Sequence, residues 1–220
     1  MFSALVDLLF PKLCLDCRRG ERVKWGLCSQ CLAKVQPTGV NACIRCGRNC
    51  PPGECAPLDH RYGRVLSIAL YRGSWRSVVL AVKFARDRSV AEELALELAA
   101  LAQEAGFDSP QIIVPVPSAS RHWRHFDVVH LVCEELSKQR NAPLLQVLAR
   151  RPGRAPQIKL NQRQRTEGLD QYIYLTGSIP HGALVWLVDD VYTTGATVDA
   201  CAGALLRAGA RSVYVFVLGN

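Results

Sequence analysis

The stretch Ala183-Leu-Val-Trp-Leu-Val-Asp-Asp-Val-Tyr-Thr-Thr-Gly-Ala-Thr197 decides the fold that we predict for this chain. Residues 183–188 are largely apolar, as in a parallel strand buried on both faces, and they run directly into Asp189 and Asp190. A turn of small residues follows and opens a helix. Because a doubly wound sheet binds ligands outside the carboxyl ends of its strands, we expect the two carboxylates to meet the substrate.

The turn after the acidic pair suits an anionic ligand. Backbone N–H groups at the start of a helix, together with the helix dipole, favour a phosphate. The segment is Thr193-Thr194-Gly195-Ala196-Thr197, in which three hydroxyls add donors and the glycine lets the backbone approach a ligand closely. The sequence therefore predicts a phosphate-binding loop beside a pair of carboxylates.

In its apolar strand, acidic pair and Thr-Gly loop the chain resembles the type I phosphoribosyltransferases. The resemblance implies that Asp189 and Asp190 hold the ribose hydroxyls of 5-phosphoribosyl-1-pyrophosphate (PRPP), that the loop holds its 5′-phosphate, and that Mg²⁺ holds the diphosphate. Purine-salvage members place an aspartate base three residues after the second acid. This chain has Thr193 there, which argues against a hypoxanthine-type reaction.

Cysteines concentrate near the N-terminus, where eight of the ten lie between Cys14 and Cys55. The first eleven residues are a short apolar run that contains Asp7 and lacks a basic start, so we expect neither a signal peptide nor membrane insertion. We infer a reducing cytoplasm as the location. Clustered cysteines in that compartment favour metal binding over disulfides.

The cysteine spacing predicts structural zinc. Two C-x-x-C knuckles separated by ten residues can present four sulfurs to one Zn²⁺, and a third knuckle with two wider-spaced cysteines predicts a second site. The spacing leaves open whether one or two ions bind, and whether the pairing is interleaved, with the first knuckle joined to the third and the second to the fourth. His60 is a candidate substitute ligand. Four thiolates leave no open coordination position for catalysis. The predicted ligands are Cys14, Cys17, Cys28, Cys31, Cys43, Cys46, Cys50 and Cys55.

The composition changes at about Leu58, so we predict a zinc-ribbon domain over residues 1–57 and a phosphoribosyltransferase-like domain over residues 58–220. The expected fold class is α/β, with a parallel sheet of type I phosphoribosyltransferase kind after the Cys-rich ribbon. Expected strands cover residues 65–71, 111–117, 172–175, 183–188 and 212–218. Expected helices cover residues 75–85, 91–105 with Ser89 as cap, 128–138 and 196–208.

Residues 112–127 narrow the resemblance to the ComF family, which combines a double zinc ribbon with a phosphoribosyltransferase-like domain. That family carries a Val-Pro-Val-Pro strand followed by Arg-Gly-Phe-Asn-Gln. This chain has Val114-Pro-Val-Pro117, then Arg124 and Phe126, with His125 in place of the glycine. The resemblance makes Arg124 a candidate ligand-binding residue.

Residues 150–165, which we call the hood segment, contain six Lys and Arg residues, two prolines and no acid. This composition is typical of a mobile, solvated basic loop. The resemblance implies a flexible cover over the site, in which Gln157, Leu160 and Arg165 match a Gln-x-x-Leu…Arg pattern. It makes Arg165, with Asp189 and Asp190, a candidate catalytic residue that neutralises the leaving diphosphate.

The sequence is compatible with three functions. The first is transfer of a phosphoribosyl group to an unknown nitrogen acceptor. The second is binding of PRPP or single-stranded DNA without transfer, as the resemblance to competence factors implies, with a protein partner on the ribbon. The third is a degenerate scaffold. The formal charge of +8 falls by about half if eight thiolates bind two Zn²⁺, so charge alone argues only weakly for nucleic acid.

Overall fold

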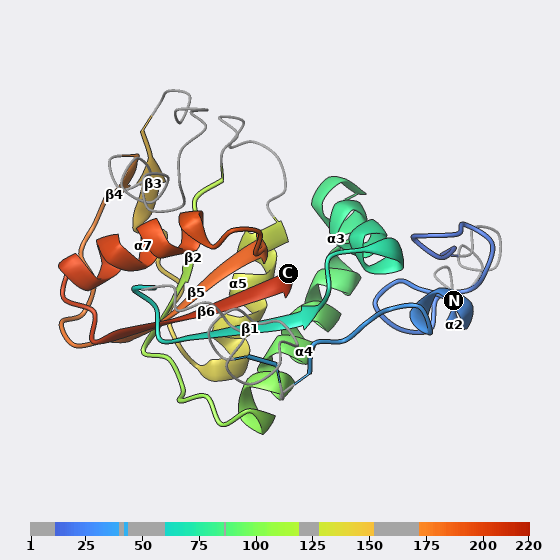
Figure 1. Ribbon diagram of the computed structural model, residues 1–220, viewed down its shortest axis with the longest axis horizontal. Helices are drawn as coiled ribbons and strands as arrows, with labels where there is room; N and C mark the ends of the chain where they lie inside the picture. The colour runs from blue at the N-terminus through green and yellow to red at the C-terminus, as the bar shows by residue number, and fades with distance from the viewer. Residues whose placement is uncertain (1–11, 40–41, 44–59, 86, 119–127, 152–171) are drawn as a thin grey trace, which may run out of the picture.

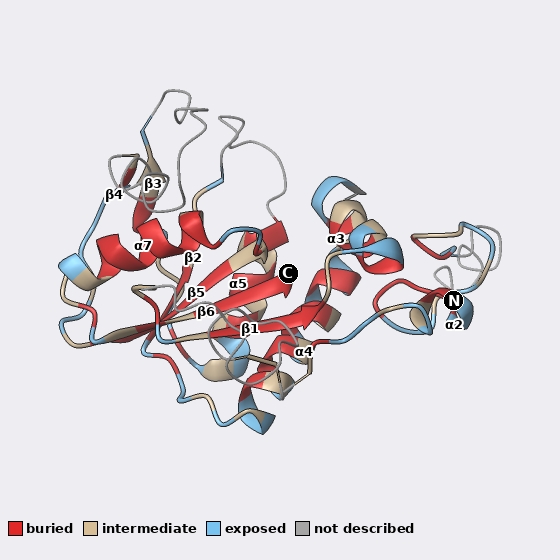
Figure 2. Ribbon diagram, in the orientation of Figure 1, coloured by how far each residue is buried: buried red, intermediate tan, exposed pale blue. Residues whose placement is uncertain are grey.

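The computed structural model describes residues 12–39, 42–43, 60–85, 87–118, 128–151 and 172–220. A four-stranded sheet of order β1-β6-β5-β2 forms the centre of this part of the chain, and each neighbouring pair of strands is parallel (Figure 1). The strands are β1 Arg64–Ala69, β2 Ile112–Pro115, β5 Leu184–Val191 and β6 Ser212–Gly219. Strands β5 and β6 are buried along most of their length, as expected for a parallel sheet covered on both faces (Figure 2).

Helices cover both faces of this sheet. Trp186 and Phe216 point into a core shared with α3 Gly73–Ala85, α4 Arg88–Glu104 and α5 Val128–Arg140. Leu187 and Val217, on the opposite face, pack in a second core with α7 Ala196–Arg207. The described part also contains the short helix α2 Ser29–Leu32 and a two-stranded antiparallel sheet of β3 Leu148–Arg150 and β4 Ile173–Leu175.

The predicted α/β class with a parallel central sheet is confirmed. Some details of the prediction are wrong. The expected strand 172–175 does not join the parallel sheet; it pairs as β4 with β3, which the sequence analysis missed because three residues are too few to show a period. Arg150 therefore lies in a strand and not in the hood loop. The strand at residues 183–188 also runs further, to Val191, so both acids belong to β5.

Helix α4 is capped by Asp87, and the prediction of Ser89 is wrong. Asp87 accepts a hydrogen bond from the Val90 N–H, and its carboxylate also accepts the Ser89 hydroxyl at 2.8 Å. Arg22 of the ribbon forms an ion pair with the same carboxylate. Although burial opposes ionisation, these donors hold the pKa of Asp87 below its ordinary value. The cap thereby ties α4 to the N-terminal segment.

Residues 12–38 pack against α3 and α4. The rings of Trp25 and Trp75 meet edge to face with centroids 5.0 Å apart, and the Trp25 backbone N–H donates to Glu93 at 2.5 Å. Asp16 accepts the hydroxyls of Ser74 and Ser77, each at 2.7 Å, and these two bonds lower its pKa. The ribbon thus shares a core with the sheet domain.

The predicted domain boundary between residues 57 and 58 lies outside the described residues and stays a prediction. None of the described helices has the length and apolar character needed to cross a membrane.

Candidate functional site

The two acids of β5 belong to opposite faces of the sheet. Successive side chains of a strand alternate between faces. Val188 packs in the core of α3, α4 and α5, so Asp190, two residues on, continues that face. Leu187 packs in the core of α7, so Asp189 continues the other. Adjacent carboxylates at one strand end therefore serve two different sides of the site.

Asp190 is held by Lys83 of α3. The Lys83 ammonium forms an ion pair with Asp190 Oδ2, and Asp190 Oδ1 accepts the Val191 N–H at 2.8 Å. Partial burial lowers the pKa of Lys83, but the carboxylates of Asp190 and Asp189 outweigh it, and the pKa is raised. Lys83 is therefore a cation at neutral pH. The role of Lys83 could not be predicted from the sequence, since no local pattern links it to residue 190.

Asp189 lies in a more costly environment. Burial and the neighbouring Asp190 carboxylate raise the pKa of Asp189 to about 7, and Arg150 opposes this shift. The Arg150 guanidinium also donates from Nε to the Pro117 carbonyl at 2.8 Å. Arg150 is therefore held at the end of the Val-Pro-Val-Pro segment, and its charge acts on Asp189. It belongs to this site and not to a solvent-exposed basic loop.

The predicted phosphate loop follows directly. Thr193 and Thr194 are exposed, Gly195 and Ala196 are buried, and Thr197 is half-buried at the start of α7. Gly195 has a φ of 77°, and a Cβ there would lie 2.4 Å from the Tyr192 hydroxyl oxygen. Only glycine fits this turn at the N-terminus of α7, because a side chain would be strained at this φ and would collide with Tyr192.

The start of α7 carries its own acid, which is neutralised. Asp199, in the first turn, accepts hydrogen bonds from Arg61 Nε at 2.9 Å and from Arg61 Nη2 at 2.8 Å. A Cβ at Gly203 would lie 2.3 Å from the Arg61 guanidinium, so glycine makes room for the arginine across the helix. Without this partner, a buried carboxylate would repel a phosphate bound at the helix start. Arg61 and Asp199 lie 138 positions apart, so no local sequence pattern predicted this pair.

His60 also lies here. Its ring stacks on Tyr62 with centroids 4.5 Å apart, and Nδ1 is 3.9 Å from Asp199. Burial lowers the pKa of His60, and Asp199 opposes the shift. The described cysteine cluster does not include His60, so its suggested role as a ligand finds no support in that cluster.

The first and second knuckles come together. Ligand atoms of Cys14, Cys17, Cys28 and Cys31 all lie within 4.8 Å of one another, and the Sγ atoms of Cys17 and Cys28 are 3.7 Å apart. Tetrahedral zinc with bonds of about 2.3 Å places its sulfurs about 3.8 Å apart. The cluster fits a closed structural zinc site, and interleaved pairing is wrong for these four cysteines.

Local backbone contacts prepare this cluster. Against the desolvation of burial, N–H donors from Cys28, Cys17 and Asp16 lower the pKa of Cys14 to about 6. Burial and the neighbouring sulfurs raise the pKa of Cys31 to about 12. A Cβ at Gly20 would lie 2.6 Å from the Cys28 Cβ, so glycine permits the close approach of the two knuckle loops. Zinc binding would displace the proton that Cys31 retains.

Five of the predicted site residues lie outside the described part of the chain: Cys46, Cys50, Cys55, Arg124 and Arg165. Cys43 is described and is not part of the four-sulfur cluster. The second zinc site and the two arginines therefore remain predictions.

Comparison with known proteins identifies the family. Residues 5–60 match the model of the double zinc ribbon domain. The DNA utilization protein YhgH of Escherichia coli is 31% identical, covering 96% of this chain and 98% of the relative. This chain belongs to the ComF family. Another ComF relative, competence protein ComFC of Bacillus subtilis, is 26% identical over 87% of this chain and 83% of its own length.

Solved structures that overlay on this ComF chain include the glutamine PRPP amidotransferase from B. subtilis. The identity is 23% and the TM-score is 0.41, over 59% of this chain and 26% of the other.

Replacing Cys31 by alanine should remove one Zn²⁺ per chain, because three thiolates cannot close the tetrahedral site. We expect one to two Zn²⁺ in the purified, reduced wild-type protein by elemental analysis. The control is Cys133→Ala in α5, a buried cysteine outside the cluster that should leave zinc content unchanged. A wild-type protein without zinc, with titratable thiols and a folded N-terminal segment, would contradict the assignment.

Replacing Asp189 by asparagine should raise the thermal unfolding midpoint at about pH 8, with a gain that shrinks towards about pH 5. The folded pKa of about 7 exceeds the ordinary aspartate value of 3.8, so between these values only the folded state holds the proton. Wild-type stability therefore falls as pH rises through this window, and the full penalty is present above it. The control Glu92→Gln, at an exposed carboxylate of α4 outside the site, should show no such gain. Equal midpoint changes at both pH values would contradict the prediction.

Proposed function

We propose that this ComF chain binds PRPP with Mg²⁺ and transfers its phosphoribosyl group to a nitrogen acceptor. The observation that carries the proposal is the carboxyl end of β5, where two acids precede the loop that starts α7, with Thr193 and Thr194 exposed. Ligands of parallel α/β sheets bind at this edge. The geometry offers hydrogen-bond acceptors for ribose hydroxyls directly beside donors for a phosphate.

Each end of the site would have a distinct task. The N–H groups and hydroxyls of residues 193–197 would bind the 5′-phosphate, because the first turn of a helix leaves its N–H groups without intrahelical acceptors. Arg61 removes the charge of Asp199 from this position. Asp190, with an exposed fraction of 18%, would accept hydrogen bonds from the ribose hydroxyls.

The transfer step replaces one bond by another at C1 of the ribose. The C1–O bond breaks with its electron pair leaving on the diphosphate, and the acceptor nitrogen forms the C1–N bond and releases its proton to solvent. Arg165 of the hood segment would neutralise the leaving diphosphate, as the family pattern implies. Thr193 cannot serve as the carboxylate base of purine salvage, so the acceptor must lose its proton without one at that position.

The donor set does not form an all-protein Mg²⁺ site. The metal-ligating cluster found among the described residues is the four-cysteine one, and the two acids face opposite sides of β5. A Mg²⁺ bound through phosphate oxygens and water fits this arrangement. It would supply charge neutralisation at the diphosphate.

Replacing Asp189 and Asp190 together by asparagine should weaken PRPP binding by more than tenfold, or about 1.4 kcal/mol, because the amides lose charge-assisted acceptors. Titration calorimetry with PRPP and Mg²⁺ measures this. The control is the double replacement of Glu92 and Glu135 by glutamine on α4 and α5, outside the site. Wild-type affinity in the Asp189/Asp190 variant would contradict the proposal.

Transfer itself is tested by release of pyrophosphate from PRPP and Mg²⁺ across a panel of nucleobases. We expect release with at least one nitrogen acceptor. PRPP binding without release under any of them would favour the second candidate, a binding factor without glycosyl transfer.

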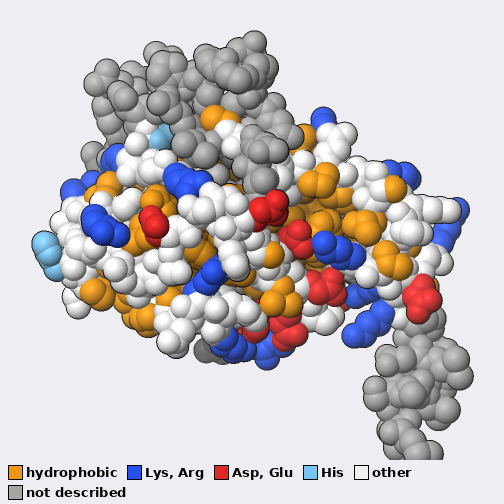
Figure 3. Space-filling view, turned by 90° about the horizontal axis from the view of Figure 1, so that it is seen from below, with side chains coloured by type: hydrophobic (Ala, Val, Ile, Leu, Met, Phe, Trp, Pro, Cys, Tyr) orange, Lys and Arg blue, Asp and Glu red, His pale blue; other side chains and the backbone are white. Residues whose placement is uncertain are grey.

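That second candidate is a factor that handles single-stranded DNA. Two observations favour it. The relatives are named a DNA utilization protein and a competence protein. Beyond Arg150, which belongs to β3, the hood segment carries five cations and no acid. On the face drawn in Figure 3, by contrast, the coloured Lys and Arg side chains are interspersed with Asp and Glu. A nucleic-acid contact would therefore centre on the hood.

Replacing Arg151 and Arg154 by glutamine should reduce single-strand affinity and make the log–log salt slope shallower by about 0.7 for each phosphate that the variant no longer neutralises. PRPP affinity should change little. Arg165→Ala should instead weaken PRPP handling, because a bidentate contact to diphosphate is charge-assisted. Arg150 is left out of the neutralised set because it donates to the Pro117 carbonyl and its charge favours the ionised form of Asp189. Equal effects of both variants on both ligands, measured by fluorescence anisotropy and calorimetry, would refute the division.

A further inference from the structure

Lys83 is a cation at the carboxyl edge of the sheet, and no local sequence motif predicts its place there. It lies near the end of α3, and its ammonium reaches the end of β5 across 107 residues of sequence to contact Asp190. The Lys83 side chain is 46% exposed, so a ligand can reach the ammonium. The residue is thus both fixed at the site and open to solvent.

Helix α3 is held firmly enough to aim this side chain. Trp75 is fully buried and donates from Nε1 to the Leu218 carbonyl at 2.7 Å. Ser74 and Ser77 donate to Asp16 within the first zinc knuckle. The sheet therefore fixes one side of the helix and the ribbon fixes another. Lys83 extends from this rigid support over the strand ends, where Figure 1 shows the arrowhead of β1 directed towards α3.

The direction of approach distinguishes Lys83 from the phosphate loop. Asp190 continues the face of β5 that packs against α3, α4 and α5, whereas the loop of residues 193–197 opens α7 on the opposite face. A ligand whose ribose sits at the acids and whose phosphate binds the loop would direct its other end towards the α3 side. The other end of PRPP is the diphosphate.

We propose that Lys83 binds the diphosphate of PRPP. In the protein without ligand, its ammonium instead pairs with the Asp190 carboxylate, the group that would accept the ribose hydroxyls. This inference rests on the proposed function and adds to it a residue and an end of the ligand. A bound diphosphate supplies oxygens that compete for the ammonium, and Asp190 is then released to accept the ribose hydroxyls. The ion pair keeps the site neutral until a ligand with both groups arrives.

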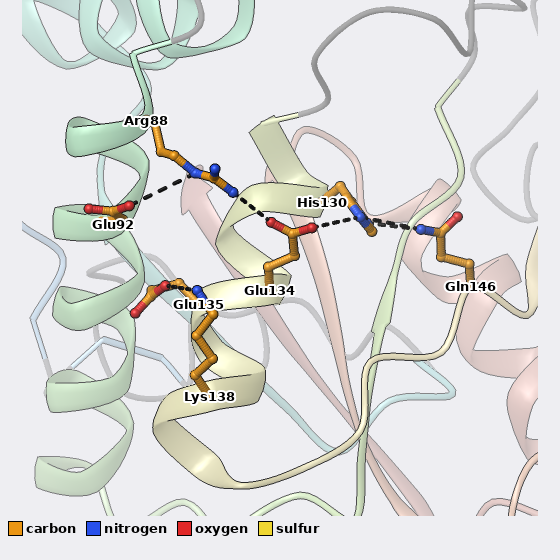
Figure 4. Close-up of polar contacts among 7 residues, drawn as sticks. All are labelled: Arg88, Glu92, His130, Glu134, Glu135, Lys138 and Gln146. Carbon is orange, nitrogen blue, oxygen red and sulfur yellow. Dashed lines mark hydrogen bonds and ion pairs between the residues drawn. The ribbon is translucent and has the colours of Figure 1, made fainter.

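Replacing Lys83 by methionine keeps most of the apolar stem and removes the charge. With Mg²⁺ present, we expect at least a tenfold loss in affinity for PRPP and for inorganic pyrophosphate, and less than a twofold change for ribose 5-phosphate. Lys83→Arg should recover part of the loss. The matched control is Lys138→Met, which removes the cation of an exposed ion pair with Glu135 on α5 (Figure 4) and should leave all three affinities unchanged.

A double-mutant cycle separates direct contact from an effect through the carboxylate. In the Asp190→Asn background, Lys83→Met should still weaken pyrophosphate binding at least tenfold if the ammonium contacts the ligand. Loss of the effect in that background, or an equal loss for ribose 5-phosphate, would overturn the inference and make Lys83 a support of Asp190. A wild-type protein that binds PRPP while Lys83→Met binds it equally well would overturn the inference alone. A wild-type protein that binds neither PRPP nor pyrophosphate would overturn both this inference and the proposed function.

Discussion

The burial of β5 on both faces is the constraint on which the site depends. Helices α3, α4 and α5 cover one face and α7 covers the other, so the strand has no polar side along its length. At its carboxyl end the alternation of side chains continues into two acids, and each acid meets the layer on its own side. Asp190 forms an ion pair with Lys83 of α3, and the charge of Arg150 in β3 favours the ionised form of Asp189. The strand that builds the core also sets the charges of the site.

The zinc ribbon packs against α3, the helix that contributes Lys83 to the site. Its first knuckle contains Asp16 between two cysteine ligands, and this carboxylate accepts two hydroxyls from α3. Trp25, in the turn before the second knuckle, packs on Trp75 of α3. Because zinc would fix both knuckles, the metal would also fix the helix that carries Lys83. A structural ion remote from the acids can in this way support their geometry.

The ionised form of Asp189, beside Asp190, lowers the free energy of unfolding. Burial and a neighbouring carboxylate raise the pKa of Asp189, so its ionised form weakens the folded state. Groups with strongly shifted pKa values concentrate at functional sites, where a ligand can offset the desolvation. Asp199 at the start of α7 differs from Asp189, because Arg61 forms an ion pair with it in the folded protein.

Local sequence patterns predicted the parallel α/β class, the strand-acid-loop-helix unit at Asp189 and Asp190, and the cysteines of the first two knuckles as candidate zinc ligands. Each of these depends on spacing within a few residues or on a local period, which the chain displays directly. Only the three-dimensional contacts show which cysteine knuckles pair, that the two acids face opposite layers, and that Lys83 pairs with Asp190 while Arg150 acts on Asp189. These contacts join residues far apart in the chain, as in the 107 positions between Lys83 and Asp190, so no local pattern could reveal them. The short strand β3 was missed for a related reason: three residues carry no period, and only pairing with β4 makes them a strand.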